Sequence, residues 1–140
     1  MMTVIDGNGL IFGRLASKVA KELLGSKEII IVNAERILMS GKPEYLINRY
    51  ITKRSLQNKG CPEHSPRWPR VPNLLVRMML RGMLPWKKPM GRAALKRLKV
   101  YNGIPASIKE TPVIYNECRP RNISKQMTIG ELCKMIGYQG

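Results

Sequence analysis

The sequence predicts an α/β fold: a three-layer α/β/α sandwich around a small, mostly parallel, four-stranded sheet that carries a basic loop-helix arm. The run Ile29-Ile30-Ile31-Val32 is β-branched without polar alternation, which is typical of a strand buried on both faces of a parallel sheet. Segments of strand type and helix type alternate along the chain, as in layered α/β domains. The 140 residues are enough for one domain, so we assign residues 1–140 to a single domain.

The first predicted unit is a βαβ crossover. A short β-type run over residues 3–5 ends in the turn cluster Asp6-Gly7-Asn8-Gly9. Residues 14–24 place their apolar side chains on one helical face, and Gly25 can supply the left-handed residue that ends this helix. The strand 29–32 follows, and such crossovers are almost always right-handed.

The middle of the chain predicts a short strand over 36–39 and a helix that Pro43 opens and that runs to about Ser55. The expected core face of this helix consists of Leu46, Ile47, Tyr50 and Ile51. Residues 56–72 contain four prolines, which predicts a loop without a packed core of its own.

Three helices and one strand are predicted in the second half. The helix 72–83 should bury Leu75, Met78, Met79 and Met83 and expose Arg77 and Arg81. Pro89 opens a helix through Tyr101, a strand covers 113–115, and Thr128 with Glu131 fits the capping box of a last helix that Gly137 ends.

Positive charge is concentrated in one part of the chain. The formal net charge is +16. Residues 64–109 carry eleven basic side chains and no carboxylate, which leaves only a small excess for the rest of the chain. Such a regional excess is typical of a surface that binds a polyanion, whereas a solubilising coat would be spread evenly.

The helix predicted over 89–101 shows how this charge would be presented. On a period of 3.6 residues, Arg92, Lys96 and Lys99 share one face, opposite the apolar side chains. An ordinary solvated helix would interleave glutamates with these cations. Like charges three and four residues apart repel each other unless phosphates neutralise them, so we interpret this face as a binding surface.

Two further features can be interpreted in two ways. Arg67-Trp68-Pro69-Arg70 combines guanidinium groups with an aromatic ring, which suits phosphate binding and base stacking. Trp68 could equally anchor the loop on the core. Arg14, Lys18 and Lys21 form a thinner basic stripe, which could equally be the ordinary polar face of an amphipathic helix.

Several other functions have weak support. No apolar run of 18 residues occurs, so the sequence predicts no membrane span. The start MMTVID has no signal-peptide pattern, and the three cysteines are expected to be reduced thiols in the cytosol. Cys61 and His64 have ligand-like spacing, but a second tight pair of zinc ligands is missing. Gly7, Gly9 and Gly13 occupy the position of a dinucleotide-binding turn with the wrong spacing. A nucleotide-dependent enzyme and a DNA-binding module remain the rival functions.

Five segments together resemble one known family: VIDGNGLIFGRLASKVAKELL, VNAERILMSGK, RGMLPWKKPMGRAALKRLKVY, VYNGIP and TIGELCKMIG. The third segment, residues 81–101, is similar to the signature of the ribosomal protein L13 family of the large subunit. The proline-rich loop over 60–72 resembles the archaeal and eukaryotic branch. The chain stops where the long helical tail of eukaryotic members would begin, so we expect an archaeal-type member.

This resemblance implies direct binding of large-subunit ribosomal RNA in the cytoplasm, with neighbouring ribosomal proteins as further partners. It implies a structural role without catalysis, cofactor, metal, membrane or small-molecule substrate. Carried over to this chain, the resemblance implies that six signature residues contact RNA: Arg81, Lys87, Lys88, Arg92, Lys96 and Lys99. The residue pattern adds Arg67, Trp68, Arg70, Arg77, Trp86, Arg97, Arg14 and Lys18 as candidates.

Overall fold

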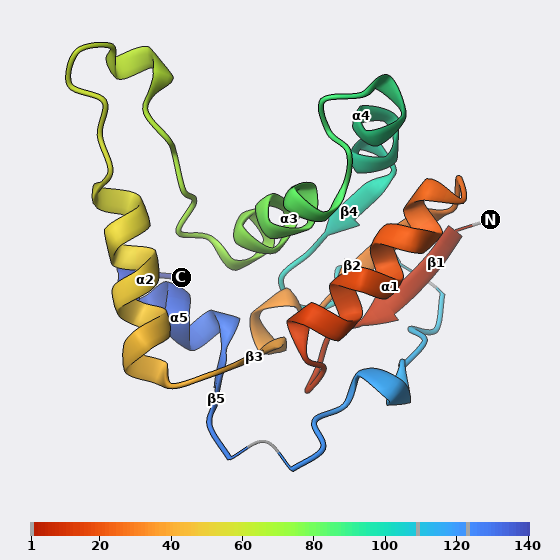
Figure 1. The fold of residues 1–140 in the computed structure, drawn as a ribbon. Coiled ribbons are helices and arrows are strands. Elements are labelled where there is room, and N and C mark those ends of the chain that lie inside the picture. Colours follow the sequence, from red (N-terminus) through yellow and green to blue (C-terminus); the bar gives the residue numbers. More distant parts are fainter. Residues whose placement is uncertain (1, 109, 123) are drawn as a thin grey trace.

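The computed structural model describes residues 2–108, 110–122 and 124–140, and it confirms the α/β class (Figure 1). Three short 3-10 helices lie between the regular elements: η1 (Ala34–Arg36), η2 (Pro62–His64) and η3 (Asn116–Cys118). The strands and α-helices are β1 (Met2–Asp6), α1 (Phe12–Leu24), β2 (Glu28–Val32), β3 (Leu38–Ser40), α2 (Pro43–Ser55), α3 (Pro72–Met83), α4 (Pro89–Lys96), β4 (Leu98–Val100), β5 (Gln126–Thr128) and α5 (Ile129–Ile136).

The main sheet has three parallel strands in the order β1-β2-β4, where four were predicted. The predicted strand 113–115 is reduced to one parallel bridge between Ile5 and Val113. The Asp6 N–H donates to the Val113 carbonyl at 3.1 Å, and the Val113 N–H donates to the Val4 carbonyl at 2.8 Å.

The two faces of this sheet are covered differently. Helix α1 packs on α3 and α4, so all three helices lie on one face and bury the main core with Ile5, Ile31 and Leu98. On the other face Val4, Ile30 and Val32 are buried with Ile108, which lies in the loop that follows β4. The helices therefore form one outer layer, and loop forms the cover over the other face at Ile108.

A second unit joins distant parts of the chain. Strands β3 and β5 pair antiparallel, and helix α5 packs against α2 and η1. The predicted capping box is confirmed: the Glu131 N–H donates to Thr128 Oγ1, and the Thr128 N–H donates to the Glu131 carboxylate. Ile129, Leu132 and Cys133 are fully buried, so this helix completes the core.

The predicted bounds of α2 and α3 are confirmed, but some details are wrong. Ile51 and Met83, predicted in the core, are 47% and 45% exposed, and Leu80 is buried instead. Helix α1 does not end on a left-handed Gly25, because Gly25 has φ −74° and the left-handed residue is Ser26 with φ 66°. Part of the strand predicted over 36–39 is the 3-10 helix η1.

The glycines between β1 and α1 have different structural roles. A Cβ on Gly7 would lie 2.7 Å from Ile37 Cγ1 and 3.1 Å from the Val32 carbonyl oxygen. Gly9 has a left-handed φ of +69°. Gly13 lies inside α1, and a Cβ there would have nothing within 4 Å. Close packing and turn geometry therefore account for Gly7 and Gly9 without any ligand.

We expect Gly7→Ala to lower the free energy of unfolding by about 1–3 kcal/mol because the new methyl group overpacks the core. Gly13→Ala is the matched control, and it should leave stability unchanged or raise it by up to about 1 kcal/mol through helix propensity. Urea unfolding followed by circular dichroism measures both. Equal effects of the two substitutions would contradict the assigned packing of Gly7.

Candidate nucleic-acid interface

The helix predicted over 89–101 is wrong beyond residue 96. Helix α4 ends at Lys96, and Leu98–Val100 forms β4 against β2, with Ile29 paired to Leu98 and Ile31 to Val100. The Ile29 N–H donates to the Arg97 carbonyl at 3.2 Å, and the Tyr101 N–H donates to the Ile31 carbonyl at 2.9 Å. Lys99 is therefore presented by a strand, and only Arg92 and Lys96 share a helical face.

The turn between α3 and α4 is held by a close backbone approach. Leu84 is buried and anchors the turn. A Cβ on Gly91 would overlap the Pro85 carbonyl group and lie 2.8 Å from the Trp86 amide nitrogen. The Lys88 N–H also donates to the Pro85 carbonyl at 2.9 Å. Only glycine at position 91 allows this contact, which fixes the turn 84–88 on α4.

This turn brings three of the candidate residues together. The Arg81 guanidinium carbon lies 4.0 Å from the centre of the Trp86 ring, within the range of a cation–π contact. Arg92 Nε donates to the Trp86 carbonyl at 3.2 Å. Lys87 and Lys88 are exposed next to Trp86 in the same turn. Sequence reasoning missed the link between Arg81 and Trp86, because it depends on how the turn folds back.

The cations of this segment have no carboxylate partner in the described chain. The three ion pairs found there are Lys18–Glu117, Lys27–Glu22 and Arg36–Glu35, and none uses a cation from residues 64–108. Repulsion among these like charges is therefore not offset by an ion pair in the part of the chain that the structure describes. The exposed members are Arg67, Arg70, Arg77, Lys87, Lys88, Arg92, Lys96 and Lys99.

Two arginines of the segment lie against the protein's own backbone. Arg97 is partly buried, and its Nη2 donates to the Leu23 carbonyl at the end of α1 at 2.8 Å. The guanidinium of Arg70 lies beside Gly137, the left-handed C-cap of α5, where a positive charge opposes the negative end of the helix dipole. The hydrogen bond connects two elements of the fold and gives Arg97 a structural role, whereas Arg70 stays exposed beside Gly137.

The basic stripe on α1 is also engaged internally. Lys18 Nζ lies 3.0 Å from Glu117 Oε2 and 4.3 Å from the centre of the Tyr115 ring. The hydrogen bond to Glu117 raises the pKa of Lys18 above its usual value. Arg14 Nη1 donates to the Arg119 carbonyl at 3.1 Å. These contacts attach residues 115–119 to α1.

The structure favours the anchoring role for Trp68. Its ring packs edge-on against Tyr50 with centroids 5.9 Å apart, and Lys53 Nζ lies 4.2 Å from its centre. Arg54 donates a hydrogen bond to the Trp68 carbonyl. Burial lowers the pKa of Lys53. Trp68 therefore fastens the loop to α2, whereas Arg67 beside it is exposed.

The candidate residues fall into two surface regions. Helix α3 has 12 residues, about 18 Å at 1.5 Å per residue. It separates the loop that carries Arg67 from the turn that carries Trp86 (Figure 1). Arg77 is exposed on α3 itself. The structure gathers Arg81, Trp86, Lys87, Lys88 and Arg92 around the turn 84–88, with Lys96 at the opposite end of α4. Arg67 lies beyond the N-terminal end of α3.

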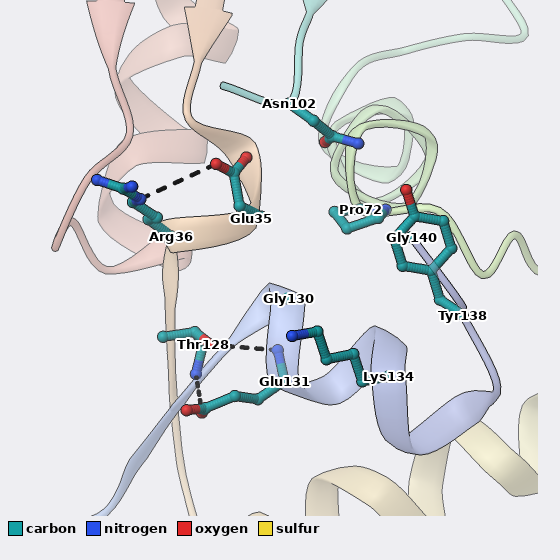
Figure 2. A pocket seen from close by; sticks show the side chains of 10 residues that line it. All are labelled: Glu35, Arg36, Pro72, Asn102, Thr128, Gly130, Glu131, Lys134, Tyr138 and Gly140. Carbon is teal, nitrogen blue, oxygen red and sulfur yellow. Dashed lines mark hydrogen bonds and ion pairs between the residues drawn. The ribbon is translucent and has the colours of Figure 1, made fainter. Parts of the chain in front are cut away.

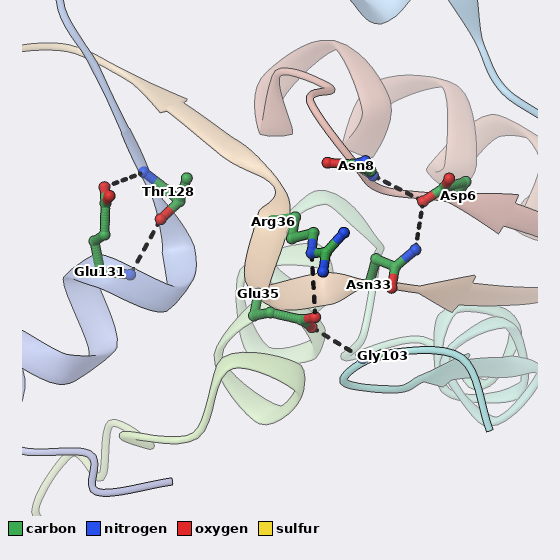
Figure 3. A network of polar contacts seen from close by, with 8 residues as sticks. All are labelled: Asp6, Asn8, Asn33, Glu35, Arg36, Gly103, Thr128 and Glu131. Carbon is green, nitrogen blue, oxygen red and sulfur yellow. Dashed lines mark hydrogen bonds and ion pairs between the residues drawn. The ribbon is translucent and has the colours of Figure 1, made fainter.

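The position of a nucleotide site in parallel α/β domains, the carboxyl edge of the sheet, is occupied by the chain itself (Figure 3). Asp6 accepts hydrogen bonds from the Asn8 N–H at 2.9 Å and from Asn33 Nδ2 at 2.8 Å. The Asn33 N–H donates to the Gly103 carbonyl, and the Gly103 N–H donates to the Glu35 carboxylate. The N–H groups of Gly9, Leu10 and Ile11 in the loop between β1 and α1 also donate to backbone carbonyls, so they are not free to bind a phosphate.

A cavity of about 380 Å³ lies near this edge (Figure 2). Its wall carries both signs of charge on each side: Glu35 lies beside Arg36 on η1, and Glu131 and Lys134 both lie on α5. Both carboxylates already accept hydrogen bonds, Glu35 from Gly103 and Glu131 from Thr128. The cavity therefore offers no cluster of one sign for an anion or a cation.

The cysteines do not assemble a metal site. Cys61 Sγ lies 3.0 Å from His64 Nδ1 on the exposed loop, but Cys118 and Cys133 are buried in the core. Burial raises the pKa of the Cys133 thiol to about 11. Among the residues that the structure describes, no three His, Cys, Asp or Glu side chains gather as metal ligands. Every helix in the described chain is too short or too polar to cross a membrane.

The fold and this surface define a class: a small α/β domain with a carboxylate-free cationic surface of the kind that binds polyanions. The family model described as ribosomal protein L13 matches residues 1–107. The chain belongs to the ribosomal protein L13 family.

Curated relatives carry the name large ribosomal subunit protein uL13. The relative from Methanosphaera stadtmanae is 41% identical and covers 98% of both chains. Relatives from Methanocaldococcus jannaschii and Methanosarcina barkeri are 43% and 44% identical, each over 97% of this chain and 98% of their own. The predicted resemblance to archaeal members is thereby confirmed.

We expect Gly91→Ala to lower the free energy of unfolding by about 1–3 kcal/mol, because a methyl group must push the Pro85 carbonyl away. Gly82→Ala is the matched control in the same segment, since nothing lies within 4 Å of its Cβ position. That control should be neutral or gain up to about 1 kcal/mol. Thermal unfolding of both variants checks the contact, and a neutral Gly91→Ala would refute it.

A second pair of substitutions separates structural from surface cations. Arg97→Gln removes the bond to Leu23 and should cost about 1 kcal/mol of stability. Lys96→Gln, one residue earlier on the exposed face, should stay within about 0.5 kcal/mol of the parent. Denaturant titrations measure the difference, and an inert Arg97→Gln would show that Arg97 does not hold α1 to β4.

Proposed function

We propose that this chain is a structural constituent of the large ribosomal subunit that binds and clamps large-subunit ribosomal RNA. Family membership and the printed names of relatives that match nearly its full length support this function. The observation that carries it is the segment 64–109, with eleven basic side chains and no carboxylate. Phosphates of an RNA would supply the missing counter-charges.

The RNA contacts follow from which cations point into solvent. The turn 84–88 and α4 offer Arg92, Lys87, Lys88 and Lys96 on one rigid support, with Lys99 following on β4. Arg67 and Arg77 extend the contact along α3. Because the grooves of RNA helices expose backbone more readily than base sequence, recognition would be chiefly of shape.

The remaining candidates support the clamp from within. Arg70 lies beside Gly137 at the end of α5, and Arg97 and Trp68 hold a strand and a loop in place through the contacts described above. Arg14 and Lys18 do the same for residues 115–119. Any RNA contact by these five is secondary in our proposal. Neighbouring large-subunit proteins are further partners, and the protein would act on cytoplasmic ribosomes without catalysis.

Two rival functions differ in measurable ways. A DNA-binding module would bind duplex DNA as tightly as RNA, so competition between the two separates it from an RNA clamp. A nucleotide-dependent enzyme would gain thermal stability from a dinucleotide. The polar groups around Asp6 and Asn33 already form hydrogen bonds within the chain, which counts against a nucleotide-dependent enzyme.

We expect the triple variant Lys87→Gln, Lys88→Gln, Lys96→Gln to bind large-subunit RNA more weakly with little loss of thermal stability, because all three side chains are exposed. If about six phosphates are neutralised, the parent should show a log–log salt slope of roughly −4, and the variant a slope shallower by about 2. Filter binding across a potassium chloride series measures both slopes.

The control variant carries the same charge change elsewhere: Lys42→Gln, Lys125→Gln, Lys134→Gln. These lysines are exposed and lie outside the acid-free segment. The control should keep the slope of the parent to within about 1, since its positions are not assigned to phosphates. If the control weakened binding as much as the triple variant, RNA binding would depend on net charge alone, and the assigned phosphate contacts would be wrong.

A further inference from the structure

We propose that Trp86 is a stacking platform for an unpaired base of the bound RNA, with Arg92 positioned for the phosphate beside that base. This inference rests on the proposed RNA-binding function and deepens it, because it names the type of nucleotide that the turn 84–88 recognises. The two tryptophans of the chain have different surroundings, and this difference carries the argument.

Trp68 is used by the fold, whereas Trp86 faces solvent. Trp68 packs on Tyr50 and against the main core. Trp86 is 39% exposed, and its ring contacts a cation, Arg81, whose guanidinium carbon lies 4.0 Å from the ring centre. A large aromatic side chain at a surface is most useful where it can contact a partner.

The backbone beneath Trp86 is fixed before any ligand arrives. The close approach of Gly91 to Pro85 leaves no room for movement of the turn toward α4. Arg92 Nε holds the Trp86 carbonyl at 3.2 Å, and buried Leu84 anchors the turn from the other side. Little conformational entropy would be lost when such a preorganised ring binds.

The chemistry around the ring fits a nucleotide. A base that stacks on the indole would extend the layered arrangement of Arg81 guanidinium and ring, in which the cation reinforces the stack. The guanidinium of Arg92 lies beside the same residue, and Lys87 and Lys88 follow it directly. Arginine can fork onto a phosphate while the base stays stacked.

An unpaired base is favoured over a duplex. In an A-form helix the faces of the bases are covered by their neighbours, and side chains reach mainly backbone and 2′-hydroxyl groups. Stacking on Trp86 needs a free base face, which a loop, bulge or single strand supplies. Lysines alone would bind duplex and single strand without this preference.

The test measures binding of the full chain and its variants to two RNA probes. One is a fluorescein-labelled single-stranded RNA of about 12 nucleotides, which is within the site size of a single-strand binding domain. The other is a blunt RNA duplex of the same length. Trp86→Ala should weaken single-strand binding about tenfold and duplex binding less than about twofold, with unchanged salt slopes. Trp86→Phe should restore most of the loss. Met90→Ala removes another exposed apolar side chain nearby, and it should change neither affinity.

Fluorescence provides a readout that does not require the alanine variant to fold. In a Trp68→Phe background Trp86 is the sole tryptophan, and single-stranded RNA should quench it strongly, whereas the duplex should not. Absence of quenching, or equal losses on both probes for Trp86→Ala, would overturn the stacking assignment. If lysine-dependent RNA binding persisted in that case, the RNA clamp would stand without a stacking site. Failure of the parent to bind either RNA would overturn both.

Discussion

The parallel pairing of β4 with β2 decides how the basic segment lies on the body of the protein. Leu98 must enter the core beside Ile29, so the helix before it ends at Lys96 and the chain straightens within one residue. The segment is consequently no appended arm: Leu75, Leu80, Leu84, Ala94 and Leu98 are all core residues. Its cations lie on the outer side of elements whose inner side holds the sheet, and their spacing is therefore fixed by packing.

Local sequence rules predicted the elements that start and stop on local signals. Prolines at the first turn and a regular apolar period set the bounds of α2 and α3, and the capping box at Thr128 placed α5. The end of α4 was missed because neither glycine nor proline marks it; its strand partner β2, far earlier in the chain, decides it. The choice between the two interpretations of Trp68 could not be made from sequence for a similar reason. The Trp68 ring packs because it meets Tyr50, which lies on helix α2 and is distant from the loop in sequence.

For the candidate site, the composition predicted which segment is basic, and the structure shows which of its side chains are engaged within the fold and which are exposed. The absence of carboxylates over 64–109 is a property of sequence, and it survives as a surface without internal ion pairs in the described chain. Which cations are available to a ligand could not be predicted, because Arg97, Arg14 and Lys18 bind backbone or carboxylate partners that are distant in sequence. Unrelieved repulsion among the others lowers the stability of the isolated protein, and a polyanion that neutralises them offsets this cost.

The pairing of β3 with β5 joins Leu38 to Thr128 and Ser40 to Gln126, and α5 then fills the core with Ile129 and Leu132. Contacts of such high sequence separation form late, since a long loop must close first. During synthesis the core-facing sides of η1 and α2 therefore stay exposed until residues 126–136 have been made and can pack against them.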